Sequence, residues 1–279
     1  MKRITITLAL LAAGCARPAY VVKSDAEGAY MQGRVAQIRE TVFDFMYSGG
    51  QDATLLPDAP GPGDTHTVVD YNRAGNVTLT EVFVGPDSVQ TVREEYFYDP
   101  PGKRLERSVE HNLARHGTTT VLYNYDDSGK LISEVESNGF FRFDLTYDRH
   151  GYPKTRIDNS SDREKPLTLT RNTYNRQGRL KSRKDGSRAR FSYHPDGTIA
   201  RIRTGKNSLD IYNTRGNLEA MAIRVKRRDQ KGRVFERFPM TLTAEYEYDA
   251  RGNWVRRVQY FKDEVQSVAV REIDYYEDR

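Results

Sequence analysis

Tyr125-Asp126-Asp127-Ser128-Gly129-Lys130-Leu131 is the clearest copy of a unit that recurs nine times along this chain of 279 residues. In each copy a tyrosine, or once an arginine, precedes Asp, Asn or His, and a glycine follows that polar residue by three positions. The turn residues are Asn72 and Gly75, Asp99 and Gly102, Asp126 and Gly129, Asp148 and Gly151, Asn175 and Gly178, His194 and Gly197, Asn213 and Gly216, Asp229 and Gly232, and Asp249 and Gly252. Their glycines are 16 to 27 residues apart, and self-similarity at such intervals indicates a repeat architecture.

The chemistry of the unit predicts a β-hairpin. Asp or Asn suits the first position of a type I turn because its side chain hydrogen-bonds the backbone two residues on, and glycine accepts the positive φ that closes the loop. The preceding tyrosine and the apolar residue two positions after the glycine are then expected to pair across the hairpin. Pro153 occupies that apolar place in the fourth copy, which predicts an edge or a distortion there.

The segments around the turns alternate as half-buried strands do. In Ala244-Glu245-Tyr246-Glu247-Tyr248 the aromatic residues recur at every second position, and the residues on the other face are charged. This pattern is typical of an antiparallel sheet with one solvated face. The sequence therefore predicts an all-β chain, a single repeat domain of successive antiparallel β-hairpins that form an extended, twisted and curved open sheet.

The repeat resembles the YD repeats of the rearrangement-hotspot (Rhs) family. Tyr125 to Leu131 and Tyr248 to Trp254 are the nearest matches, and the likeness extends over residues 71 to about 262. The resemblance implies a spiralling sheet of hairpins, which larger relatives use as a shell around a toxin or as an extracellular scaffold. This chain is short and has no evident toxin domain after Tyr260, so it is more similar to small lipoproteins with YD-type repeats.

The N-terminus has the shape of a secretory signal. Lys2 and Arg3 precede a short, mostly apolar stretch that ends in Leu11-Ala12-Ala13-Gly14-Cys15, and this ending resembles the lipobox of bacterial lipoproteins. The resemblance implies cleavage before Cys15 and attachment of a diacylglycerol to its sulfur. Leucine usually stands three residues before the cysteine, where this chain has Ala12, and an ordinary cleaved signal is the alternative. The expected organisation is a signal peptide at 1–14, a lipidated tether at 15–29 and a YD-repeat-like β domain at 30–279.

Cysteine content and charge fit an exported protein. Cys15 is the only cysteine, so no disulfide can form within one chain, and a domain of this size buries a core without one. Ala16 after the cysteine implies, by resemblance to Gram-negative lipoproteins, the outer membrane. Because Lys2 and Arg3 leave with the signal, the net charge of +5 falls to +3. Basic and acidic residues alternate along the predicted strands, so no nucleic-acid partner is expected.

Three segments interrupt the repeat. Residues 31–47 are compatible with a first strand or a short helix, and the strand is favoured by Thr41-Val42-Phe43. Residues 48–66 contain Gly49-Gly50 and Pro60-Gly61-Pro62-Gly63, which predict a loop. A second loop is predicted at 159–166.

Catalytic motifs are not recognisable. Glu110, His111 and His116 come nearest to a metal cluster, but their spacing matches no helical zinc motif, and each turn offers one carboxylate where a calcium loop needs several. We therefore expect no metal, no cofactor and no enzyme activity. An enzyme would need a deep pocket with converging carboxylates such as Glu134, Glu136 and Asp144.

Two binding hypotheses stand beside that enzyme hypothesis. The first is an outer-membrane-anchored envelope lipoprotein that serves as a non-enzymatic scaffold or protein-binding surface, held to the membrane through Cys15. The alternative is a carbohydrate-binding module whose tyrosines stack on glycans. Burial separates the two, because the glycan hypothesis needs exposed rings at Tyr96, Tyr123, Tyr125, Tyr246 and Tyr248. The oligomeric state and the identity of any envelope protein or glycan partner do not follow from the sequence.

Overall fold

The computed structural model describes residues 25–45, 61, 63–100, 102–161, 164–228 and 233–277. The expected signal peptide, Cys15, and the turn residues Asp229 and Gly232 lie outside these ranges. The described chain is all-β apart from two short helical turns, α1 (Asp25–Gly28) and η1 (Leu113–Arg115). The strands are β1 (Val35–Asp44), β2 (Thr65–Tyr71), β3 (Val77–Val84), β4 (Val89–Tyr98), β5 (Leu105–Asn112), β6 (Gly117–Tyr125), β7 (Leu131–Glu136), β8 (Arg142–Tyr147), β9 (Pro153–Asp158), β10 (Leu167–Tyr174), β11 (Leu180–Asp185), β12 (Ser187–Tyr193), β13 (Ile199–Thr204), β14 (Ser208–Tyr212), β15 (Leu218–Arg228), β16 (Val234–Tyr248), β17 (Trp254–Phe261) and β18 (Glu264–Tyr275).

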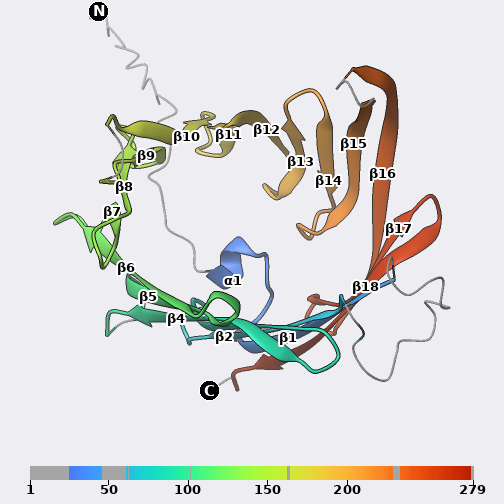
Figure 1. Cartoon of the computed structure of the whole chain (residues 1–279), viewed down its shortest axis with the longest axis horizontal. Helices are drawn as coiled ribbons and strands as arrows, with labels where there is room; N and C mark the ends of the chain where they lie inside the picture. Colours follow the sequence, from blue (N-terminus) through green and yellow to red (C-terminus); the bar gives the residue numbers. More distant parts are fainter. Residues whose placement is uncertain are drawn as a thin grey trace, which may run out of the picture.

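The sheet is closed. Every strand pairs antiparallel with its neighbours in sequence, and β1 pairs with both β18 and β2, so the 18 strands form a complete ring (Figure 1). The prediction of an open sheet is therefore wrong. Segment 35–44 provides the missing strand, since it fills the place between the last strand and β2 and so removes both free edges. The strand alternative for residues 31–47 is the one that the structure has.

Apolar side chains pack on both faces of the strands at this closure. Val268 and Ala269 are consecutive in β18, so they point to opposite faces, and both are fully buried. One face carries a cluster of Val35, Ile38 and Tyr71 with Ala26 of α1, which lies inside the ring in Figure 1. A second cluster is formed by Phe45, Val258 and Val268. The best-packed part of the barrel therefore lies where its two ends join.

The connections alternate between the two ends of the barrel. Because the strands follow one another in sequence around the ring, the turns after even-numbered strands share one end and those after odd-numbered strands share the other. The eight described repeat turns all follow even-numbered strands, at residues 72–76, 99–104, 126–130, 148–152, 175–179, 194–198, 213–217 and 249–253. We call this end the repeat rim and the opposite end the far rim.

Where β8 pairs with β9, the register shifts between Thr146 and Tyr147, as it does at the same place in other repeat hairpins. Pro153 therefore lies at a distortion, one of the two predicted alternatives, and not at an edge. It is the first residue of β9, it pairs with Tyr147, and β9 also pairs with β10. A proline at the start of a strand removes no ladder hydrogen bond that the sheet needs. The closed ring has no edge for it to occupy.

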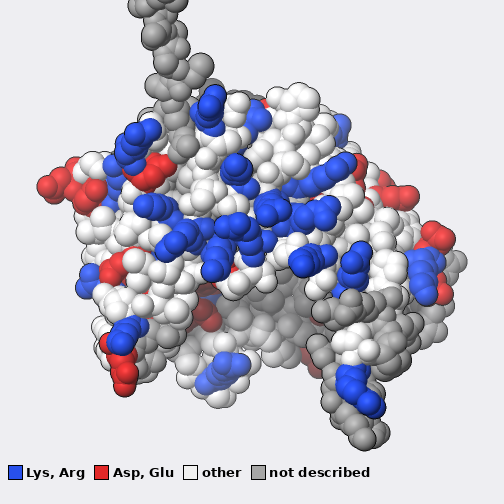
Figure 2. Space-filling view, turned by 90° about the horizontal axis from the view of Figure 1, so that it is seen from above, with Lys and Arg blue, Asp and Glu red and all other residues white. Residues whose placement is uncertain are grey.

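The outer wall is not uniform in charge. Over the strands β10–β13, at the top of the ring in Figure 1, the outward face carries a dense band of Lys and Arg side chains with little acidic surface between them (Figure 2). On the other side of the ring, Arg93 is paired with Glu81 and Glu95 at 2.8 Å. The two walls therefore present different surfaces to solvent.

Candidate functional site

The repeat turns share one hydrogen-bond pattern. In the turn at Asp126, the N–H of Gly129 donates to the carbonyl of Asp126 at 2.8 Å, and the N–H of Asp126 donates to the carbonyl of Lys130 at 2.9 Å. The Asp126 carboxylate accepts the N–H groups of Ser128 and Lys130, both at 2.9 Å. All eight described glycines have positive φ, as this loop requires. The Asp, Asn and Gly residues of the repeat therefore serve to form the turns.

These hydrogen bonds change the acidity of the turn carboxylates. The Ser128 hydroxyl and the backbone N–H of Lys130 lower the pKa of Asp126 below its usual value. The backbone N–H groups of Arg104 and Lys103 do the same for the pKa of Asp99. Each donor stabilises the ionised carboxylate, so these groups are anionic hydrogen-bond acceptors and are poorly suited to general acid catalysis.

The repeat tyrosines link one hairpin to the next. Tyr125 pairs with Leu131 across its own hairpin, as the sequence predicts, and its hydroxyl donates to the carbonyl of Leu105 in the preceding hairpin at 2.8 Å. The same link recurs with donor–acceptor distances of 2.6–2.8 Å from Tyr98 to Val77, Tyr147 to Leu131, Tyr174 to Pro153 and Tyr193 to Leu180. In the last copy the link to Leu218, at 2.7 Å, comes from Tyr246, two residues before the repeat tyrosine Tyr248. Sequence reasoning missed this second role. The available signal was the use of tyrosine in eight of nine units, where phenylalanine would pack equally well.

Burial keeps these hydroxyls protonated. Desolvation raises the pKa of Tyr193 to about 12 and also raises the pKa of Tyr98. The five rings that the glycan hypothesis needs, Tyr96, Tyr123, Tyr125, Tyr246 and Tyr248, are half-buried. Several of their hydroxyls are engaged, since Tyr248 accepts Asn213 and Asn217 at 3.1 Å and Tyr123 lies 3.3 Å from the Ser108 hydroxyl. Their rings are therefore poorly placed for stacking on a sugar.

Residues 25–34, which we call the rim segment, lie against the repeat rim. The N–H of Ala26 donates to the carbonyl of Gly75 at 2.9 Å, and the Asp25 carboxylate accepts the N–H of Val77 at 2.8 Å. Further along, Gln32 and the buried Asn253 exchange two hydrogen bonds, both 2.7 Å. The packed chain thus begins before residue 30, within the stretch expected to be tether.

Tyr30 holds the middle of the rim segment. Its ring lies so close to Gly216 that a Cβ there would be 2.2 Å from the ring atom Cδ2. Only glycine fits at this place, which also has φ of +79°. Gly216 therefore forms its own turn and also leaves room for the Tyr30 ring of the rim segment.

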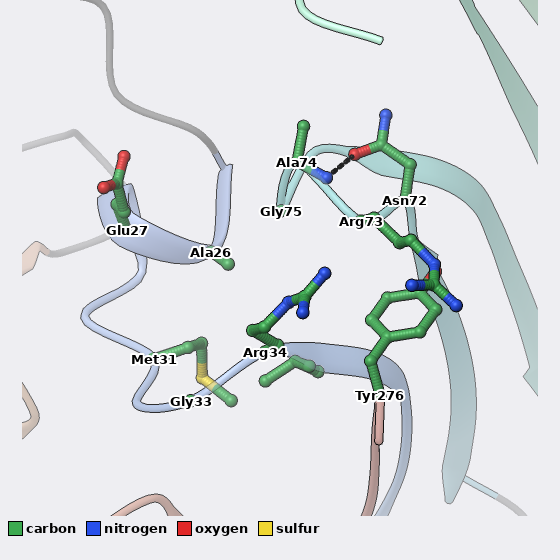
Figure 3. Close-up of a pocket in the computed structure, with 11 residues that line it drawn as sticks. Ala26, Glu27, Met31, Gly33, Arg34, Asn72, Arg73, Ala74, Gly75 and Tyr276 are labelled. Carbon is green, nitrogen blue, oxygen red and sulfur yellow. Dashed lines mark hydrogen bonds between the residues drawn. The ribbon is translucent and has the colours of Figure 1, made fainter. Parts of the chain in front are cut away.

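A cavity of about 210 Å³ lies between the rim segment and the turn after β2 (Figure 3). Arg34 points into it from one side, and the guanidinium of Arg73 lies 5.3 Å from the ring centroid of Tyr276 on the other. The remaining lining residues are Ala26, Glu27, Met31, Gly33, Val35, Asn72, Ala74 and Gly75. Glu27, Arg34, Asn72, Arg73 and Tyr276 give the cavity its polar side chains, and none of the lining residues is Ser, Cys or His.

The residues considered for metal binding or catalysis do not converge. Glu110 and His111 are consecutive in β5 and point to opposite faces, while the Nδ1 atom of His111 lies 3.1 Å from the Thr118 hydroxyl. Within the described ranges, no group of three potential metal ligands is present. Glu134 pairs with Phe143 in the β7–β8 register, so Asp144, the next residue, faces away from Glu134.

Ion pairs already engage two of these carboxylates. Glu134 binds Arg156 at 2.6 Å, and Asp144 binds Arg142 at 2.9 Å.

In the described part of the chain, no helix is long and apolar enough to cross a membrane.

Comparison with known proteins gives remote likenesses only. No family model matches the chain, and no curated protein does. Among solved structures, the Photorhabdus luminescens Tc holotoxin pore with a TccC3 mutant is 11% identical with a TM-score of 0.30, and the TcdB2–TccC3 complex is 12% identical with a TM-score of 0.30. This chain aligns over 75% of its own length with both but spans only 14% and 15% of theirs. A porin-like protein from Bacteroides uniformis is 13% identical with a TM-score of 0.38 over 87% of this chain and 98% of that one.

Proposed function

We propose that this chain is a lipid-anchored envelope protein whose barrel acts as a non-enzymatic scaffold or protein-binding surface. The observation that carries the proposal is that most side chains of the repeat have a structural role. Its Asp and Asn side chains cap turns, its glycines supply positive φ, and most of its tyrosine hydroxyls bond the neighbouring hairpin. Few side chains of the repeat are left for catalysis, so we expect the functional surfaces to lie outside the repeat.

The outer membrane is the proposed location. A closed barrel is compatible with it, and the lipobox-like ending at Cys15 supports attachment by a lipid. Nine residues, and so ten Cα-to-Cα steps, separate Cys15 from Asp25, the first residue of the rim segment. At about 3.3–3.6 Å per residue, a lipid on Cys15 would hold the repeat rim within roughly 35 Å of the bilayer.

Lipid attachment has a direct test. Cells that express the chain are fed labelled palmitate, and the protein is isolated from membrane fractions. The wild type should carry label and should sediment with the outer membrane, whereas Cys15→Ala should carry none and should be released from it. Label on the Cys15→Ala variant, or its unchanged retention, would refute the anchor.

The far rim supports a protein partner. Apolar side chains there are unusually exposed: Phe140 by 46%, Phe141 by 44%, Val89 by 58% and Leu167 by 45%. Phe140 and Phe141 pack edge to face with ring centroids 4.8 Å apart, so they present one rigid aromatic surface. Exposed apolar groups gathered at one end of a molecule are typical of protein interaction sites.

Affinity capture from envelope extracts tests this role. The chain should capture the same partner repeatedly, and Phe140→Ser with Phe141→Ser should abolish capture. Phe97→Ser is the matched control, because Phe97 is 36% exposed near the end of β4 at the repeat rim, the end of the barrel opposite to Phe140 and Phe141. A glycan array run in parallel tests the carbohydrate alternative, which would replace our proposal if sugars bind and no protein does.

A further inference from the structure

The cationic band on β10–β13 is assembled by the strand register. Arg171 of β10 stands opposite Lys184 of β11, which stands opposite Arg188 of β12. Beside this row, Arg190 of β12 stands opposite Arg203 of β13, and Arg201 lies two residues before Arg203. Residues paired across an antiparallel sheet share a face, and alternate residues of one strand do too, so these six cations occupy one face. We call this face the cationic wall.

Neutral side chains complete the cationic wall. Thr173, Ser182 and Ser192 share it through the same register. Asp185, the acidic residue of strands β10–β13, lies on the opposite face because it is adjacent to Lys184. Asp210 of the next strand, β14, also lies there, since it pairs with Ile202. All six cations are exposed, and among the described residues none of them has an ion-pair partner. The sequence expectation that basic residues alternate with acidic ones along the strands therefore fails at this wall, because β10, β12 and β13 contain no acidic residue.

The arrangement is unfavourable for the isolated protein. Like charges directly opposite each other on a sheet destabilise it, and the row of Arg171, Lys184 and Arg188 places three together. Elsewhere in the barrel, outward arginines are paired with carboxylates. Arg39, for example, lies 3.0 Å from Glu272 and 3.1 Å from Asp274. A surface that concentrates unpaired cations is suited to an external anion.

The shape of the wall selects among anions. Strands about 4.8 Å apart and alternate residues about 7 Å apart give a two-dimensional grid of charges on a broad, convex surface. Single-stranded nucleic acid is bound by a groove with aromatic side chains for base stacking, and the residues placed on this face include no aromatic one. A two-dimensional grid matches the phosphate headgroups of an anionic bilayer.

We propose that the cationic wall docks the barrel onto an anionic phospholipid surface. Basic side chains close to such a surface each contribute about 1 kcal/mol, which is about fivefold in affinity, and the interaction is screened by salt. The wall cannot face the hydrocarbon itself, because Arg or Lys on the lipid side of a barrel is strongly unfavourable there. Docking by this wall requires no acyl group, so it stands or fails separately from the lipid anchor.

The test uses the full chain with Cys15→Ala and co-sedimentation with vesicles. Vesicles of phosphatidylglycerol and phosphatidylcholine are compared with phosphatidylcholine alone at about 0.1 M and about 1 M salt, where the Debye length falls from about 10 Å to 3 Å. We expect binding only to the anionic vesicles and only at the lower salt. Arg190→Gln with Arg203→Gln should lower the partition coefficient by about 25-fold, from about fivefold for each charge.

The control variant removes two exposed cations elsewhere, Lys103→Gln with Arg115→Gln, and changes the net charge equally. It should bind almost as the parent does. Equal loss in both variants, or equal binding to neutral vesicles, would overturn the proposal. Tighter binding of single-stranded DNA or of an acidic polysaccharide than of the anionic vesicles would also overturn it, in favour of that polyanion.

Discussion

At the scale of single residues, the repeat divides its work between local and neighbouring contacts. Asp126 and Gly129 close a loop of a few residues, and Tyr125 reaches across to Leu105 of another hairpin. The loop residues were predictable, because a turn depends on residues adjacent in the chain. The tyrosine link was not, because it depends on which hairpins lie side by side.

Tyr125→Phe should lower the free energy of unfolding by about 1 kcal/mol, since it leaves the half-buried hydrogen bond to the Leu105 carbonyl unmade. Urea unfolding followed by circular dichroism measures the change. Tyr212→Phe is the matched control, because no hydroxyl partner of Tyr212 is present among the described residues. Equal losses in both variants would mean that the hydrogen bond from Tyr125 to Leu105 contributes nothing to stability.

The turn carboxylates predict acid sensitivity. The folded-state pKa of Asp126 is lowered, so its contribution to stability is complete above the unfolded pKa near 4 and is lost as the pH falls through the lower folded value. Asp126→Asn should therefore show a flatter decline of thermal midpoint between about pH 4 and pH 2 than the parent does. Parallel declines in parent and variant would contradict the assignment.

At the scale of the elements, the rim segment depends on one place without a side chain. Gly216→Ala should destabilise by more than 1 kcal/mol, because the methyl group overlaps the Tyr30 ring and the backbone has positive φ. Gly205→Ala isolates the backbone cost, since Gly205 has φ of +59° and nothing lies within 4 Å of its Cβ position. The difference between the two losses of stability measures the packing of Tyr30 on Gly216. Equal losses would show that the rim segment does not pack there.

Strand identity was largely predictable, and strand faces were less so. Alternation in Ala244 to Tyr248 identifies part of β16, but it does not say that Arg190 stands opposite Arg203. Register between strands depends on several turns at once, and a shift of one residue reverses the faces. A single strand shows at most two cations on one face, such as Arg188 and Arg190, and only the register joins the strands into the cationic wall.

At the scale of the whole molecule, closure depends on the pairing of β1 with β18. No local pattern in residues 35–44 specifies a partner some 230 residues away, so the sequence predicted an open sheet. Closure also explains why Pro153 has no edge to occupy. The far rim and the cationic wall exist as surfaces only because the ring is complete.

Two ion pairs at this closure differ in burial and allow a matched comparison. Glu40 and Arg271 are 2.7 Å apart with side chains 20% exposed, whereas Arg39 and Glu272 are 3.0 Å apart with side chains 37% and 72% exposed. Glu40→Gln should cost about 1–3 kcal/mol because it leaves Arg271 without its counter-ion, and Glu272→Gln should cost less than about 0.5 kcal/mol. Chemical denaturation measures both, and equal costs would refute a buried ionic contribution to closure.

The rim segment also determines how the barrel bears mechanical load. A pull on the N-terminal side of Asp25 is shared among the turns at Gly75, Gly216 and Asn253, which belong to three different hairpins of the ring. Strand β1 cannot be peeled from its end until those attachments break. In a single-molecule stretching experiment the chain should therefore resist with one early force peak before the strands unzip, and Asn253→Ala should lower that peak without removing the later ones.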